Sequence, residues 1–269
     1  MIKVIVYLIG FILLFKGYIK YIESKSIFFP SQEIENTPSI FGLKYEDIFI
    51  PAPDGIKLNA WFIPSEGSKY TLLFFHGNAG NISTRLDKIQ ILNSINTNVF
   101  IVDYRGYGLS EGKSNEKNAY TDAEIAYDYL INERKLQPSN IIVYGESLGG
   151  AMAVDLAAKK KIKGIILEGT FSSGTDMGRV IYPFIPRFLF SKILDSIGKI
   201  RQIDVPKLVI HSQEDEVVPF KLGKKLFDSA DPPKQFVKIH GGHNSAFLDS
   251  QDIYVSAIAA FLKSLDSDK

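Results

Sequence analysis

Ile141-Ile-Val-Tyr-Gly-Glu-Ser-Leu-Gly-Gly150 is the stretch of sequence that decides the fold. Four residues with strand character lead into Gly145-x-Ser147-x-Gly149, and small residues then begin a helix. A serine at such a sharp strand-to-helix turn has a strained backbone, and its hydroxyl is held out at the carboxyl edge of a sheet. A motif with only three fixed positions also occurs by chance, but the flanking strand and helix favour a catalytic role for the serine. We therefore predict that Ser147 is a nucleophile.

Composition limits the kinds of protein this can be. The chain has 269 residues, of which 45% are hydrophobic, enough for one large domain with a substantial core. A net charge of +1 gives no electrostatic case for a nucleic-acid partner. The absence of cysteine excludes disulfides and thiolate metal sites, and the four histidines lack the close pairs typical of zinc sites. We therefore expect no metal site.

The amino-terminal residues are strongly apolar. The run at 4–15 is broken only by Gly10, but a helix of that length covers about 18 Å, whereas the hydrocarbon core of a bilayer is about 30 Å thick. Extension to residue 22 takes in Lys16 and Lys20, which could reach the headgroups. We interpret residues 1–26 as a hydrophobic helix that anchors the protein in a membrane.

Two alternatives for this segment stay open. Lys3 followed by an apolar run is also the opening of a secretory signal peptide, although Ser24-Lys25-Ser26 is a poor cleavage site. A buried amino-terminal helix is the other alternative, but the run shows no polar face. More lysines follow the run than precede it, which predicts a cytoplasmic body, with export as the alternative.

The remainder alternates between strand and helix patterns. Residues 27–39 are interpreted as a linker on the domain surface, and period-2 alternation at 45–50 and 58–63, around a Pro-Asp-Gly turn, predicts an antiparallel hairpin. Short apolar runs separated by helical spacing then predict buried parallel strands. Residues 27–269 are thus expected to form one α/β domain with a mostly parallel central sheet of about eight strands and helices on both faces.

Residues 170–205 break this alternation. Two prolines interrupt an apolar and aromatic stretch at 180–190, unlike an ordinary helix that covers a sheet. One interpretation is a loop and helix folded into the core. The other, which we favour, is a lid over the mouth of the site that lines an acyl pocket or touches a bilayer, with Tyr182, Phe184 and Phe188 binding substrate.

The acid that would orient a catalytic base is sought after the strand at 207–211. Asp215 lies just beyond that strand, before an apolar pair and a proline. Glu214 and Glu216 are neighbouring alternatives that we expect to be solvated, and Glu168 is an alternative at the end of an earlier strand. We choose Asp215 because a carboxylate buried there could fix the tautomer of the base.

The base and the oxyanion hole are sought in the same way. His243 lies two glycines beyond His240 after the last strand, in a loop that could carry it over the serine, whereas we expect His240 to be structural. The amides of Asn78, which follows the strand at 71–75, and Leu148 are our candidates for the oxyanion hole. An ordinary turn with a buried histidine is the alternative reading of the loop containing Asn78.

Several motifs in this order resemble the Bem46 and ABHD13/ABHD17-like serine hydrolases of the α/β-hydrolase fold. They are Phe28-Phe-Pro30, Asp54-Gly55 with Trp61-Phe62, His76-Gly-Asn-Ala-Gly-Asn81, Asp103-Tyr-Arg-Gly-Tyr-Gly-Leu-Ser110, Gly145-Glu-Ser-Leu-Gly149, Asp215 with Val218-Pro219, and Gly242-His243-Asn244. The resemblance covers residues 28–261. It implies an intact hydrolase, often tethered by an amino-terminal hydrophobic segment, with some relatives acting on acyl thioesters of lipidated proteins.

The expected reaction is a two-step acyl transfer on an ester or thioester, in the chain order Ser147, Asp215, His243, and it calls for no cofactor. The expected substrate is a small or lipidated acyl compound, and the expected partner surface is a membrane reached through the amino-terminal segment. A serine aminopeptidase and a non-catalytic, membrane-tethered adaptor on the same scaffold are the alternatives. Acyl chain length and oligomeric state stay open.

Overall fold

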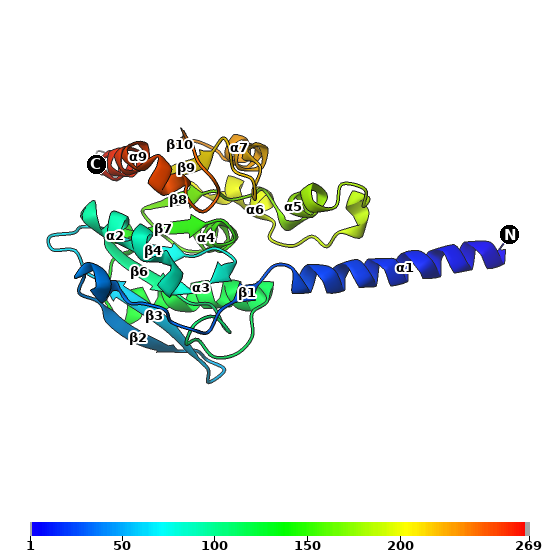
Figure 1. Ribbon diagram of the computed structural model, residues 1–269, viewed down its shortest axis with the longest axis horizontal. Coiled ribbons are helices and arrows are strands. Elements are labelled where there is room, and N and C mark those ends of the chain that lie inside the picture. Colours follow the sequence, from blue (N-terminus) through cyan, green and yellow to red (C-terminus); the bar gives the residue numbers. More distant parts are fainter. Residues whose placement is uncertain (1, 267–269) are drawn as a thin grey trace.

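A mixed sheet forms the centre of the computed structural model, which describes residues 2–266 (Figure 1). The order of its eight strands is β10-β9-β8-β7-β4-β6-β3-β2. Their bounds are β2 Glu46–Pro51, β3 Lys57–Ile63, β4 Thr71–Phe75, β6 Asn98–Val102, β7 Ile141–Glu146, β8 Gly164–Glu168, β9 Lys207–Ser212 and β10 Lys234–Ile239. The pairs β2–β3 and β3–β6 are antiparallel and the other neighbouring pairs are parallel, so the predicted mostly parallel α/β sheet is confirmed.

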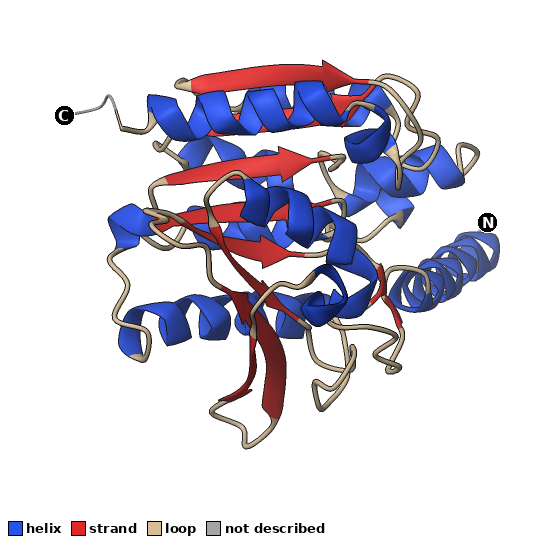
Figure 2. Ribbon diagram, turned by 60° about the vertical axis from the view of Figure 1, so that its left-hand side comes forward, coloured by secondary structure: helices blue, strands red, loops and turns tan. Residues whose placement is uncertain are grey.

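Helices cover both faces of the sheet (Figure 2). One core contains side chains of α3 (Glu116–Asn132), α4 (Gly149–Ala157) and α7 (Phe220–Ser229). The core on the other face contains side chains of α2 (Leu86–Ser94) and α9 (Gln251–Ser264). Residues 72–75 of β4 alternate between the two cores, which explains why all four are apolar.

The amino-terminal helix α1 (Ile2–Lys25) extends away from this body (Figures 1 and 2). Within residues 2–266, none of the helices combines the length and the apolar character that crossing a membrane requires. The expected membrane-spanning helix is therefore not confirmed. Lys16 and Lys20, which interrupt the apolar sequence, are exposed on α1.

Residues 27–39, predicted as a surface linker, contain an unpredicted strand. β1 (Phe29–Pro30) pairs in parallel with β5 (Ala79–Gly80), in the loop that follows β4. The Phe29 amide donates to the Asn78 carbonyl at 2.9 Å, and the Ser31 amide donates to the Gly80 carbonyl at 3.0 Å. The segment after α1 is thus fastened to the loop at the carboxyl end of β4.

Residues 170–205 depart from the regular alternation, as their sequence predicted. They form α5 (Gly174–Ile181), η4 (Arg187–Leu189), α6 (Ser196–Lys199) and η5 (Ile200–Gln202) between β8 and β9. α5 and the chain that follows it project from the body on the same side as α1 (Figures 1 and 2), and η4 contacts α1. The segment therefore stands over the carboxyl end of the parallel strands, next to the amino-terminal helix.

The turn from β7 into α4 depends on very close backbone packing. A Cβ atom on Gly145 would lie 2.6 Å from the Cα of Gly150, and a Cβ on Gly149 would overlap the carbonyl oxygen of Phe75 in β4. Because backbone atoms cannot rotate away as a flexible side chain does, these two positions exclude larger residues. The glycines of the sequence motif are therefore explained by packing of the helix against β4 and β7.

We expect Gly149→Ala to lower the free energy of unfolding by roughly 3 kcal/mol, because the added methyl group would force α4 away from β4. Chemical denaturation monitored by circular dichroism measures the change. Gly17→Ala is the control, since a Cβ at Gly17 of α1 meets no atom within 4 Å. Equal stability of the two variants would contradict the packing argument.

Candidate active site

Ser147 occupies the turn between β7 and α4 with a backbone φ of 50°. Its amide donates to the Glu168 carbonyl at 2.8 Å, and its carbonyl accepts a hydrogen bond from the Thr170 hydroxyl at 2.8 Å. A residue other than glycine keeps this left-handed conformation only where its surroundings fix it. Here the end of the neighbouring strand β8 fixes both backbone groups of the turn.

Ser147, His243 and Asp215 are joined by hydrogen bonds between their side chains. His243 Nε2 lies 3.0 Å from Ser147 Oγ, and His243 Nδ1 lies 2.7 Å from Asp215 Oδ2. The loops after β9 and β10 carry Asp215 and His243 to the end of β7. An ionised carboxylate only accepts hydrogen bonds, so Nδ1 carries the proton and Nε2 accepts from the serine hydroxyl. In this tautomer His243 can remove the hydroxyl proton.

Asp215 is buried and held by several donors. Its Oδ1 accepts from the amides of Val217 at 3.0 Å and Val218 at 2.7 Å, and Nε2 of the buried His211 lies 3.4 Å from Oδ2. Burial opposes ionisation, but the hydrogen bonds from His211 and His243 outweigh it and hold the pKa of Asp215 below its ordinary value. Asp215 therefore stays ionised at neutral pH.

The side chains considered as alternative acids and as the alternative base form hydrogen bonds other than those that join Ser147, His243 and Asp215. Glu168 receives two hydrogen bonds of 2.9 Å from the Lys88 ammonium group. Glu214 pairs with His240 at 2.9 Å, and both of these side chains are exposed. Glu216 accepts a hydrogen bond of 2.9 Å from a backbone amide. His240, which we expected to be structural, lies at the surface, where its backbone amide also donates to the Ser250 hydroxyl at 2.8 Å.

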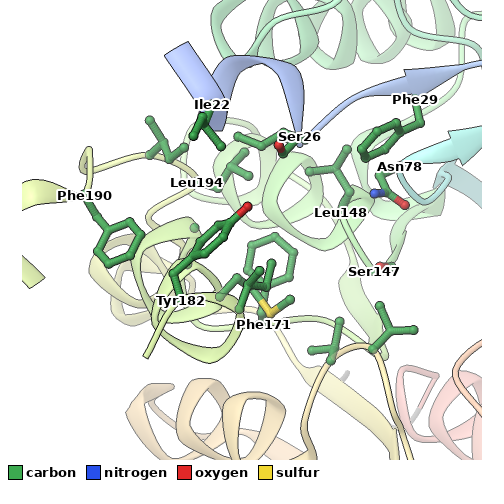
Figure 3. Close-up of a pocket in the computed structure, with 18 of the residues that line it drawn as sticks. Ile22, Ser26, Phe29, Asn78, Ser147, Leu148, Phe171, Tyr182, Phe190 and Leu194 are labelled. Carbon is green, nitrogen blue, oxygen red and sulfur yellow. The ribbon is translucent and has the colours of Figure 1, made fainter. Parts of the chain in front are cut away.

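Asn78 and Leu148, whose amides we expected to form the oxyanion hole, line the same cavity as Ser147 (Figure 3). Asn78 lies in the loop between β4 and β5, and Leu148 follows Ser147 at the start of α4. A Cβ atom on Gly77 would lie 3.5 Å from the Cβ of Ser147, so the loop runs close against the serine. The loop is therefore placed where its amides can meet an oxygen bound at Ser147.

The peptide group of Asn78 is held on its carbonyl side by two donors from distant parts of the chain. The hydroxyl of Tyr107 donates to the Asn78 carbonyl at 2.7 Å, and the amide of Phe29 donates to it at 2.9 Å. Tyr107 is fully buried against the ring of His76. The carbonyl therefore points away from the serine towards β1 and Tyr107.

The residues on either side of Asn78 are held by an ion pair. The Arg85 guanidinium binds Glu146 at 2.7 Å through Nε and donates to the Ala79 carbonyl at 2.9 Å through Nη2. The Gly77 amide donates to the same Glu146 oxygen at 3.3 Å. Because Glu146 immediately precedes Ser147, this pair ties the loop directly to the turn that carries Ser147.

Glu146 belongs to a group of buried and half-buried charges that sequence reasoning missed. Lys88, only 2% exposed, lies 2.7 Å from Glu146 and 2.9 Å from Glu168, and Glu168 also accepts from the Tyr144 hydroxyl. Burial would raise the pKa of Glu146, but the positive charges of Arg85 and Lys88 outweigh it and hold this pKa well below the ordinary value. The signal in the sequence was a single lysine amid the apolar positions of a helix.

Two cavities of different character meet at Ser147. The larger has a volume of about 510 Å³ and a mostly apolar lining that includes Ile22, Phe171, Tyr182 and Phe190 (Figure 3). The smaller has a volume of about 380 Å³, and its lining includes Thr84, Arg85, Glu146, His243 and Asn244. The serine can therefore receive an apolar group on one side and a polar group on the other.

Of the three aromatic residues that we expected to bind substrate, one lines the larger cavity and two do not. Tyr182 lines the larger cavity. Phe184 and Phe188 do not line it; they are 96% and 67% exposed. The prediction for Phe184 and Phe188 was wrong because Pro183 and Pro186 turn the chain, which sends neighbouring aromatic side chains in different directions.

In the described part of the chain, no three His, Asp or Glu side chains come together in a way that could hold a metal ion.

Comparisons with known proteins agree with the observed fold. A family model described as alpha/beta hydrolase fold matches residues 70–192. Protein bem46 of Schizosaccharomyces pombe is 37% identical, over 88% of this chain and 84% of its own length. Human alpha/beta hydrolase domain-containing protein 17B is 38% identical, over 74% of this chain and 68% of its own length. An esterase of Pyrococcus furiosus shares the fold with a TM-score of 0.73 at 21% identity, over 89% of this chain and 98% of that chain.

The support for the Asn78 peptide group can be tested with Tyr107→Phe, which removes one donor to its carbonyl. We expect kcat on a soluble short-chain ester to fall about tenfold with little change in KM, because a displaced amide would stabilise the transition state less and leave substrate binding intact. Steady-state kinetics measures both constants.

Tyr127→Phe is the matched control for this variant. The Tyr127 hydroxyl also donates to a backbone carbonyl, that of Lys161 at 2.6 Å, but it does so from α3. Each variant should lose about 1 kcal/mol of stability. An equal fall in kcat in both variants, or an unchanged kcat in Tyr107→Phe, would refute a specific role of Tyr107 in holding the loop.

Proposed function

Because the chain belongs to the α/β-hydrolase family, in the group that includes bem46 and alpha/beta hydrolase domain-containing protein 17B, we propose that it is a serine hydrolase of apolar acyl esters or thioesters. The observation that carries this proposal is the hydrogen-bonded chain of Ser147, His243 and Asp215 at the junction of an apolar and a polar cavity. Hydrolases of this fold use such a chain to activate a serine hydroxyl.

In the proposed reaction, His243 Nε2 takes the proton from Ser147 as Oγ attacks the acyl carbonyl carbon. The amides of Asn78 and Leu148 donate to the oxygen that becomes negatively charged. Asp215 stabilises the imidazolium ion that forms. His243 then protonates the leaving alcohol or thiol, and water releases the acyl group from the serine by the same steps.

The two cavities suggest how a substrate lies in the site. The group that protonates a leaving group must be within hydrogen-bond reach of it. His243 lines the polar cavity, whereas the apolar cavity is lined by Leu148, Phe171 and similar residues. The acyl chain therefore occupies the apolar cavity, and the alcohol or thiol leaves through the polar cavity.

A tagged fluorophosphonate tests the proposed function before any substrate is known, because it reacts with activated serines. We expect the wild-type protein to be labelled, and Ser147→Ala and His243→Ala to show no labelling. Thermal unfolding of each variant shows whether it is folded. Labelling of folded Ser147→Ala would place the reactive serine elsewhere, and an unreactive, folded wild type would favour the non-catalytic adaptor.

The assignment of the apolar cavity predicts a change in chain-length preference in Met177→Trp. Met177 lines the apolar cavity, so a larger side chain there should exclude long acyl chains. We expect kcat/KM for an octanoyl ester to fall about tenfold relative to an acetyl ester of the same alcohol. An equal effect on both esters would mean that the acyl chain binds elsewhere.

A further inference from the structure

The chain that follows α5 carries an unusual density of exposed apolar side chains. Phe184 is 96% exposed and Phe188 67%, and Ile181 and Tyr182 are also exposed. These four side chains lie at the outer end of the 170–205 segment. We call residues 181–188 the tip. Scattered single apolar residues are normal on a protein surface, but four within eight residues at the end of α5 and in the loop after it indicate a binding surface.

This tip is continuous with the apolar cavity next to Ser147. Ile181, Tyr182 and Ile185 line the cavity, while Phe184 and Phe188 lie outside it. The apolar side chains of the tip thus lead directly into the lining of the cavity.

Helix α1 extends the apolar surface beside the tip. Its last turns meet the body, where Ile19 is buried and Ile22 lines the apolar cavity. Phe11, Leu14 and Tyr18 are exposed along the projecting part of the helix. The tip and α1 lie on the same side of the molecule (Figures 1 and 2).

The charges around the tip are positive. Between residues 179 and 192 the chain contains Arg179, Arg187 and Lys192 and no acidic residue. Arg179 and Arg187 are exposed, and the Lys192 side chain pairs with Asp195. Exposed aromatic side chains flanked by arginines suit the boundary between the headgroups and acyl chains of an anionic bilayer.

We propose that the tip at residues 181–188 is a membrane-docking surface that inserts Phe184 and Phe188 into an anionic phospholipid bilayer and opens the apolar cavity to it. The bilayer is the occupant that matches both the aromatic tip and its positive charge. The biological role of this docking rests on the proposed acyl hydrolase function, but the docking itself can be measured without turnover. It makes acyl groups embedded in a bilayer the substrate class of the site.

A tryptophan placed at the tip reports insertion directly. The chain has a single tryptophan, Trp61, which is buried in β3, so Phe184→Trp adds a second emitter in an exposed position. With vesicles of phosphatidylcholine and phosphatidylglycerol, we expect its emission to shift to shorter wavelength and to be quenched by lipids brominated on their acyl chains.

Phe49→Trp is the matched control, because Phe49 is an exposed phenylalanine on the edge strand β2. We expect no shift and no quenching in this variant. The proposal is overturned if Phe184→Trp does not respond to vesicles, or if the two reporters respond alike.

The charge can be tested in the same reporter. Arg179→Gln and Arg187→Gln should each weaken the affinity of Phe184→Trp for phosphatidylglycerol-containing vesicles about fivefold. Pure phosphatidylcholine should bind more weakly and respond less to these changes. Equal affinity for both kinds of vesicle would overturn the preference for an anionic bilayer.

Hydrolysis of a soluble short-chain ester by the same samples separates the two proposals. A protein that inserts the tip but hydrolyses nothing retains the docking surface and loses the proposed function. A protein that hydrolyses the ester while Phe184→Trp stays in water retains the function and loses the docking surface.

Discussion

The left-handed backbone of Ser147 is the constraint on which the site depends. A residue other than glycine in this conformation carries a strain of about 1–3 kcal/mol, so the surrounding structure must supply compensating contacts. The Ser147 amide donates to the Glu168 carbonyl at the end of β8, the Ser147 carbonyl accepts from Thr170, and glycines let α4 pack directly on β4 and β7. The result is a hydroxyl fixed at the point where the loops after β4, β9 and β10 meet. Asp215 and His243 can reach Ser147 because those loops leave parallel strands at the same edge of the sheet.

The site also requires that the negative charges next to this turn are balanced by positive ones. Lys88 and Glu168 are buried side by side, and the half-buried Glu146 and Arg85 complete the group. A buried charge without a partner would be costly, so each of these side chains depends on the others. They come from the turn that carries Ser147, from β8 and from the start of α2, and Arg85 also reaches the loop that contains Asn78. Electrostatic balance thus ties together parts of the site that are far apart in the sequence.

The sequence predicted the features that follow local rules. Apolar runs separated by helical spacing indicated the strands of the sheet, and their order placed Ser147, Asp215 and His243 at strand ends. Features that depend on long-range partners were missed. Nothing in Phe29–Pro30 distinguishes a strand from a linker until Ala79–Gly80 lies beside it. Likewise, the aromatic residues at 182–188 were identified as a group, but only the folded chain shows that Tyr182 points inward and Phe184 outward.

The hydrogen bond from Phe29 to Asn78 has a consequence for how the protein can be shortened. Apolar amino-terminal segments are commonly removed to obtain a protein that is easier to handle, and here α1 ends only a few residues before Phe29. A version that begins after residue 31 would keep every strand of the large sheet and all of Ser147, His243 and Asp215. It would nevertheless lack one of the two donors that hold the Asn78 carbonyl, together with the wall of the apolar cavity formed by Ile22 and Phe29. Its kinetics would therefore describe a damaged site on an intact scaffold.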